Sequence, residues 1–130
     1  LEHIHDVNNL FIKINYFLNP SGMLLIAVPN LNAPERKFYN KNWAPYDAPR
    51  HLYHFNLGSL TKLCKKYGYE IIQKHSLYQD TPYHIILSMK NFNPIQLIKA
   101  CCVLIYSYLH TLIAGPKCAS SILILCKKSV

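Results

Sequence analysis

An amphipathic segment, a proline–glycine turn and a short apolar run follow one another directly near the start of the chain. In residues 7–18 the apolar positions recur at steps of three and four, which predicts a helix with one buried face, capped by Asp6. The sequence NPSG at 19–22 ends that helix. The run MLLIAV, residues 23–28, is typical of a strand covered on both faces in a parallel sheet. If residues 1–6 end a preceding strand, the order predicts a β-α-β unit and an α/β fold.

A unit of this kind places ligand-binding residues at the carboxyl ends of its strands. In this chain Glu2-His3 and Pro29-Asn30 both occupy such ends. The connection that follows, residues 31–58, is long for a compact domain, and connections of that length are usually lids or binding loops. We therefore expect the functional site at this edge of the sheet.

Two further strands complete the expected sheet. Residues 59–77 predict a helix, opened by Asn56 or Ser59, and then a charged strand suited to a sheet edge. Residues 120–130 contain the run SILILC, which is apolar enough for the interior of the sheet. The sheet should therefore carry its last strand inside rather than at the edge.

Residues 78–119 are an apolar insertion between those two strands. The stretch 95–114 is about as long as a membrane span, but Lys99 and His110 interrupt it. A buried or interfacial helix is the main interpretation, and a membrane-spanning helix is the alternative.

The chain is basic, with 14 Lys and Arg against 6 acidic residues and a formal charge of +8. This balance would suit nucleic acid or an anionic membrane surface. The basic residues are scattered, and Lys62, Lys65 and Lys66 have the spacing of one solvated helix face, so we expect no specific nucleic-acid partner. A membrane surface contacted through 95–114 stays open. The five cysteines form no Cys-x-x-Cys pair, which predicts reduced thiols, a cytoplasmic location, peripheral to the membrane if 95–114 binds it, and no structural zinc.

The loop WAPYDAPRHLYHF, residues 43–55, is rich in side chains that bind and catalyse. Its two prolines exclude a long helix or a central strand. One interpretation is a binding site. The other is a rigid surface loop whose aromatic residues cap the core.

Taken in order, the motifs along residues 1–77 form a recognisable set. They are Leu1-Glu2-His3-Ile4 with Asp6, Leu18-x-Pro20-x-Gly22, Val28-Pro29-Asn30, Trp43, Asp47-x-Pro49-Arg50-His51-Leu52-x-His54-Phe55, the Leu60/Leu63 helix and Gly68-Tyr69. This set resembles the C-terminal half of class I S-adenosylmethionine-dependent methyltransferases, in particular the ubiquinone-biosynthesis-like branch.

The resemblance implies a Rossmann-like seven-stranded methyltransferase sheet with an antiparallel last strand, of which residues 1–130 form a partial domain. The family's G-x-G-x-G loop and the acidic residue that holds the ribose are missing from this chain. We therefore expect the activity to belong to a longer parent protein and the fragment to be inactive alone. The implied parts are the end of strand four, a helix and strand five in 1–30; a substrate lid loop in 31–58; a helix and strand six in 59–77; a helical apolar insertion in 78–119; and strand seven in 120–130.

The resemblance also implies S-adenosylmethionine as cofactor and a small-molecule, lipid or glycan-type acceptor. Methyl transfer is an in-line displacement that needs positioning, exclusion of water and, for a hydroxyl acceptor, a base. His51 and His54 are the candidate catalytic bases, and Trp43, Asp47 and Arg50 are candidate substrate-binding residues. In the alternative interpretation Arg50 pairs with Asp47 to lock the loop, and one histidine only bonds to the backbone.

Glu2 and His3 are expected to bind the cofactor, by orienting it and the substrate. In ubiquinone-type relatives the corresponding pair accompanies a divalent cation, so a partial metal shell is the alternative. We expect no zinc site from the histidines, because no cysteine or acid completes one at ligand spacing. Two other functions stay open: a non-catalytic domain that binds a membrane surface, and a truncated remnant.

Overall fold

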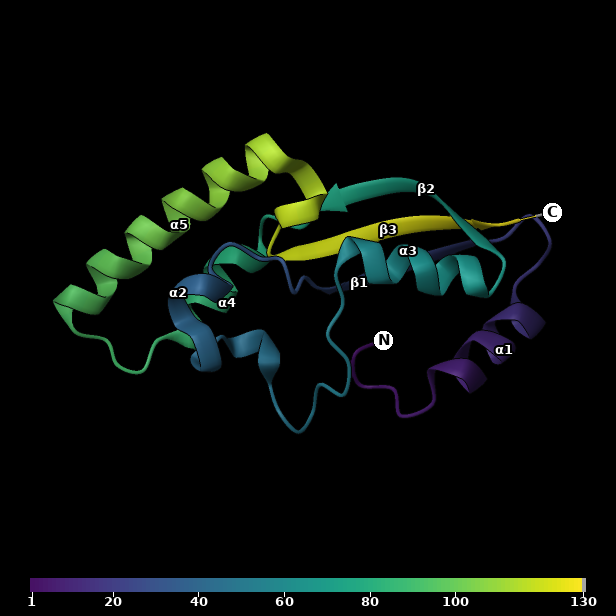
Figure 1. Ribbon diagram of the computed structural model, residues 1–130, viewed down its shortest axis with the longest axis horizontal. Helices are drawn as coiled ribbons and strands as arrows, with labels where there is room; N and C mark the ends of the chain where they lie inside the picture. The colour runs from purple at the N-terminus through teal and green to yellow at the C-terminus, as the bar shows by residue number, and fades with distance from the viewer. Residues whose placement is uncertain (130) are drawn as a thin grey trace.

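The protein is described by a computed structural model that covers residues 1–129. Its sheet lies at one end, and a long helix extends away from it at the other (Figure 1). The elements follow in the order α1 (Val7–Phe17), β1 (Met23–Pro29), α2 (Arg36–Tyr39), the 3-10 helices η1 (Asn40–Asn42) and η2 (Ala44–Tyr46), α3 (Leu57–Lys66), β2 (Tyr69–Ser76), α4 (Asp80–Ser88), α5 (Pro94–Ala114), the 3-10 helix η3 (Gly115–Cys118) and β3 (Ser121–Lys128).

The three strands form one sheet in the order β1-β3-β2. The last strand, β3, pairs antiparallel with both neighbours, so β1 and β2 run parallel to each other. This confirms the predicted antiparallel strand between the other two. It also confirms the α/β class, with a helical insertion before the last strand.

Helix boundaries follow the predicted capping residues. The Asp6 carboxylate accepts a hydrogen bond from the Asn9 amide at 2.9 Å, which starts α1. Asn56 and Ser59 both take part at the start of α3, because each side chain bonds to the backbone amide of the other. Gly68 follows α3 with a φ of 78°, a conformation that costs glycine little.

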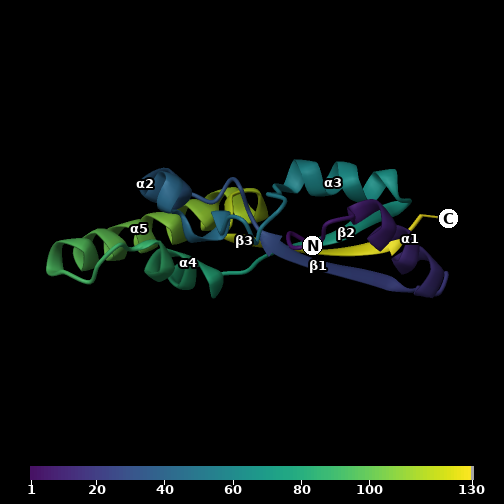
Figure 2. The same ribbon diagram turned by 90° about the horizontal axis from the view of Figure 1, so that it is seen from below.

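Helices α1 and α3 cover one face of the sheet (Figure 2). Between them and the strands lies the main core, to which each of these helices and strands contributes at least one buried side chain. The core residues are Val7, Phe11, Ile26, Val28, Phe55, Leu60, Cys64, Tyr69, Ile122, Ile124 and Cys126. Alternate positions of β3 point into this layer, which is why SILILC could be placed inside the sheet.

The opposite face of β1 is exposed, and the expectation that both its faces are covered was wrong for this chain. Met23 and Leu25 are 58% and 59% exposed, and Figure 2 shows no helix over that face of the strands. An apolar run signals burial but cannot reveal which chain segment provides it.

Two further expectations need correction. Residues 1–6 form a turn and not the end of a strand, because no described residue forms a ladder with them. In the insertion, α5 exposes most of its surface, so the buried form of its predicted helix was also wrong.

Candidate active site

The carboxyl end of β1 is fixed to the start of β3 by one buried side chain. Asn30 is fully buried, and its amide nitrogen donates to the carbonyl oxygens of Lys117 at 3.1 Å and Ala119 at 2.8 Å. Its amide oxygen accepts from the backbone of Asn32 at 3.0 Å. The chain therefore leaves the sheet at a rigid point, and the long connection of residues 31–58 starts there.

An ion pair holds the tip of this connection. Both Nε and Nη2 of Arg50 donate to Oδ1 of Asp47, at 3.1 Å and 2.7 Å. Asp47 has a φ of 33°, in the left-handed region, where Asp is among the better-tolerated residues. The hydrogen bond from Arg50 lowers the pKa of Asp47 below its ordinary value. This is the loop-locking pair that the sequence left as an alternative.

His51 faces the interior of the site with one nitrogen unoccupied. Its Nδ1 lies 2.7 Å from the carbonyl oxygen of Pro45, and a carbonyl can only accept, so Nδ1 carries the proton. Nε2 is then free to accept in the neutral ring and lies 3.7 Å from Oδ2 of Asp47. This tautomer suits a general base.

The first residues of the chain pack against the loop. The Glu2 carbonyl accepts from the backbone amide of Leu52 at 2.8 Å, and His3 Nδ1 lies 3.1 Å from the Arg50 carbonyl oxygen. The rings of His3 and His51 are 4.5 Å apart. Consequently ligand atoms of Glu2, His3 and His51 all lie within 4.8 Å of one another. The sequence motif paired Glu2 with His3 as a possible metal shell but did not include His51, because it comes from a distant segment.

His3 and His51 line a cavity of about 580 Å³, within the size range of small-molecule sites. Most of the predicted site residues meet there, together with three residues of α4 that the sequence did not indicate. The lining residues are His3, Pro29, Ala44, Pro45, Asp47, Arg50, His51, Tyr83, His84 and Leu87.

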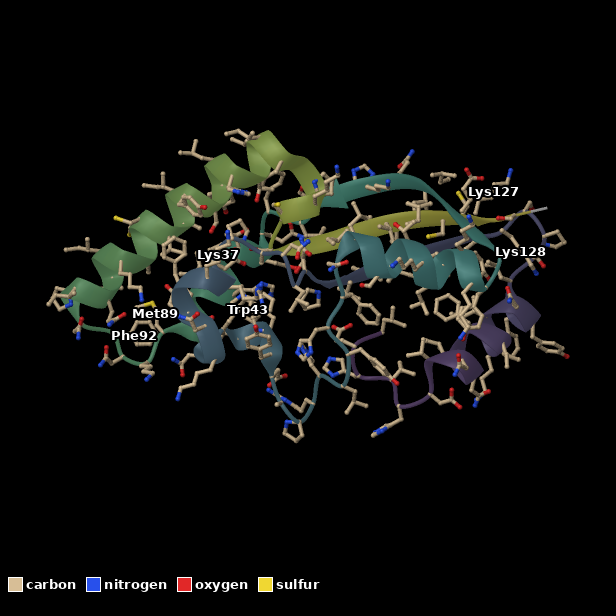
Figure 3. The ribbon with its side chains drawn as sticks, viewed as in Figure 1. Lys37, Trp43, Met89, Phe92, Lys127 and Lys128 are labelled. Carbon is tan, nitrogen blue, oxygen red and sulfur yellow. The ribbon has the colours of Figure 1, made fainter. Side chains whose placement is uncertain are left out.

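Three predicted site residues, Glu2, Trp43 and His54, lie outside this lining. Trp43 is only 2% exposed and packs with Tyr39, Ile85 and Val103 in a second core, so it acts as a core residue and not as a wall of the large cavity. Figure 3 shows it in the part of the molecule that holds α2 and α4, far from Lys127 and Lys128. His54 is exposed and bonds through Nε2 to the Tyr46 carbonyl at 3.2 Å. Both histidines of the loop therefore contact the backbone, but only His51 lines the cavity.

Behind the cavity lies a buried polar group that sequence reasoning did not find. Glu35 is fully buried, its Oε1 accepts a hydrogen bond from Ser120, and the hydroxyls of Ser120 and Thr81 are 2.9 Å apart. His84 Nδ1 lies 3.9 Å from the same carboxylate oxygen. A glutamate in a loop and a single histidine in an apolar helix carry no sequence signal of this contact.

A comparison with protein families identifies the chain. The family described as methyltransferase domain matches residues 1–74, more than half of the chain. The chain belongs to that family. Its match covers the motifs from Leu1 to Tyr69, which confirms the predicted class of enzyme but does not test the ubiquinone-biosynthesis-like branch.

Two solved structures are similar to this methyltransferase domain over nearly its whole length. Both are phosphoethanolamine N-methyltransferase 2 of Haemonchus contortus, one with S-adenosyl-L-methionine and one with phosphomonomethylethanolamine and S-adenosylhomocysteine. Each is 15% identical, with TM-scores of 0.49 and 0.50, and each match covers 99% of this chain but 31% of that one. The likeness to the second structure shows the fold, and the chain spans about a third of those proteins. No curated protein matches the chain.

Proposed function

We propose that this chain is the substrate-side portion of a longer S-adenosylmethionine-dependent methyltransferase. The observation that carries the proposal is the cavity of His3, Asp47, Arg50 and His51 at the carboxyl end of β1, in a chain of the methyltransferase domain family. Ligands of open α/β sheets bind at this edge. The cofactor-bound neighbours of the same fold support the choice of cofactor.

The residues present fit one end of that cofactor. The Glu2 side chain is 16% exposed and lies beside His3 and His51. Carboxylates are ionised at neutral pH, so Glu2 suits a cationic group. S-adenosylmethionine supplies an electrophilic methyl group when bound. The groups that hold its ribose and adenine would come from upstream residues.

In the proposed mechanism the chain positions the acceptor and takes its proton. The Asp47–Arg50 pair fixes the lid, and the remaining guanidinium donors of Arg50 are available to the acceptor. His51 accepts the acceptor's proton at Nε2, because Nδ1 is held by the Pro45 carbonyl. The acceptor is a small molecule or the head of a lipid-linked one. Membership of the ubiquinone-biosynthesis-like branch and a cytoplasmic location remain part of this proposal.

A divalent cation is an alternative occupant of the group Glu2, His3 and His51. Both imidazoles bind a backbone carbonyl through Nδ1, which leaves both Nε2 atoms as ligands, as is usual around metal-bound histidines. One carboxylate and two imidazoles suit a first-row divalent metal, which would supply Lewis-acid polarisation of an oxygen. Titration with Mn²⁺ would distinguish this use of His51 from that of a base.

The full-length protein, with the residues upstream of Leu1, is the material for testing the enzyme proposal. We expect it to bind S-adenosylmethionine in calorimetry and to transfer tritium from its labelled methyl group into a small-molecule extract. His51→Ala should lower turnover by about 10²-fold or more with cofactor affinity retained, the usual size of a general-base contribution. His54→Ala should change it by only about two- to threefold, because loss of an exposed contact costs about 0.5 kcal/mol. Absence of cofactor binding by the full-length protein would exclude the proposal.

Binding to a membrane surface is a second candidate function, with or without catalysis. The segment Pro94–Cys118 is long and apolar enough to cross a membrane, and only 22% of its most apolar window is buried. Helix α5 turns Ser107 and Thr111 inward, at 0% and 3% exposure, while Ile98 and Leu112 are 65% and 68% exposed. A helix of a water-soluble protein has the opposite arrangement. This inverted exposure supports contact with lipid.

A further inference from the structure

The buried carboxylate of Glu35 has a single cationic neighbour among residues 1–129. The ring of His84, on α4, places Nδ1 3.9 Å from Oε1, and no other basic group lies within 4.0 Å. The remaining contact is neutral, since Ser120 donates to Oε1 and Oε2 has no partner. An ionised carboxylate with no exposure to water is costly unless a positive charge compensates it. Among the described residues, His84 is the basic side chain that lies near enough to supply this charge.

His84 connects this buried carboxylate to the cavity. Its side chain is 9% exposed and the ring lines the cavity, while Nδ1 is buried and faces Glu35. The other nitrogen, Nε2, is therefore the one available to a ligand. A protonated ring presents Nε2–H as a charged donor at the cavity wall. Trp43 packs edge-on to the ring at 6.3 Å between centroids and restricts its movement.

The remaining charged groups of the cavity also favour an anion. Arg50 lines it, and two of its nitrogens are bonded to Asp47, so its fork keeps further N–H groups for a ligand. Asp47 is the only acidic residue among the lining residues and is already paired. The other titratable groups that face this space are His3, His51 and Tyr83, with Tyr39 near the Glu35 side.

We infer that the cavity binds an anionic group of the acceptor, a phosphate or a carboxylate, through Arg50 and a protonated His84 that Glu35 holds in place. The acceptor's identity as a methyl acceptor rests on the proposed function, whereas the anion site does not. Glu35 is a positioning residue here, since it acts through His84 and does not reach the cavity. The inference narrows the substrate class to acceptors with such a group.

Anion binding to the full-length protein tests the inference without any transfer assay. Sulfate and methyl phosphate represent the phosphate class, and acetate represents the carboxylate class. Their binding is measured by calorimetry and by the ring signals of ¹⁵N-labelled histidine in NMR. We expect His84 to respond, and sulfate, whose charge is constant, to bind at least about tenfold more weakly at pH 8 than at pH 6, because the charge-assisted hydrogen bond is lost with the proton. If sulfate and methyl phosphate bind more strongly than acetate, the acceptor's group is assigned to the phosphate class. If acetate binds more strongly, the group is assigned to the carboxylate class.

His84→Gln and Glu35→Gln should each weaken anion binding about tenfold or more and reduce its pH dependence, while His3 and His51 stay in the cavity wall. Matched controls are His75→Gln and Glu70→Gln, which change exposed residues of β2 outside the cavity and should behave as wild type. Retained S-adenosylmethionine affinity shows that a variant is folded. Arg50→Gln tests the other proposed anion-binding side chain independently. Anion affinity that is unchanged in both His84→Gln and Glu35→Gln overturns the site, as does absence of anion binding at pH 6. A wild-type protein that binds anions but not S-adenosylmethionine would instead remove the methyl-transfer proposal.

Discussion

His51 and His54 are three residues apart, yet their environments differ. His51 lines the cavity with a free Nε2, whereas His54 uses its Nε2 on a backbone carbonyl at the surface. Their spacing in the sequence gave no reason to prefer one as the base. The bend of the loop that gives them different surroundings depends on contacts with η2 and with Glu2. The distinction between a base and a structural histidine therefore could not be read from the motif.

Trp43 should contribute stability rather than substrate contact. Its indole is buried in the second core, so Trp43→Ala should lower the free energy of unfolding by about 3–5 kcal/mol, the usual cost of a large aromatic truncation. Trp43→Phe should cost less, because it keeps most of the ring and removes a buried N–H that has no partner. Urea denaturation of the full-length protein measures both. If Trp43→Ala left stability intact and abolished acceptor binding, the core assignment would be incorrect.

The Asp47–Arg50 pair gives the lid a defined response to acid. The pKa of Asp47 is lowered from 3.8 by the hydrogen bond with Arg50, so the pair stabilises the folded lid above that pH and is lost as the pH falls through the lowered value. Titration of the Asp47 carboxyl carbon signal by NMR should give a midpoint below 3.8. Arg50→Gln should move it upward toward the ordinary value. A midpoint that does not move would mean that the ion pair is absent in solution.

At the scale of elements, local rules predicted the sheet and its capped helices well. Asp6, Asn56 and Gly68 act at short range, and the apolar SILILC run requires a covered strand wherever it falls. The only site residues predicted were those that belong to a sequence motif, such as Arg50 and His51. Glu35 and His84 were not predicted, because the contact between their side chains depends on how α4 packs behind the loop.

Helix α5 is the element whose exposure most directly suggests a partner. Ile105 and Leu109 are 61% and 56% exposed on its outward side, so Ile105→Glu and Leu109→Glu should greatly reduce co-sedimentation with anionic phosphatidylserine vesicles. The matched control is Ile12→Glu, which changes a residue of α1 that is 64% exposed. An equal loss of vesicle binding in Ile12→Glu would show a general effect of the added negative charge rather than a contact through α5. Unchanged binding by all three variants would exclude α5 as the lipid contact.

At the scale of the whole molecule, the uncovered side of the sheet indicates where the remaining residues of the proposed longer protein should dock. Strand β1 pairs only with β3 among the described residues, and its outer face carries the exposed Met23 and Leu25. An unpaired edge next to exposed apolar surface favours association with further strands. In the full-length protein we expect upstream strands to pair with β1 and a second layer to cover that face.

Hydrogen exchange of the β1 amides tests this arrangement. Amides of β1 that point away from β3 should exchange at least about tenfold more slowly in the full-length protein than in residues 1–130 alone, because a new ladder must open before exchange. Amides of β2 on the other edge of the sheet provide the internal comparison and should change little. Protection that rises at β2 and not at β1 would place the upstream strands on the wrong edge and contradict a site completed at the carboxyl end of β1.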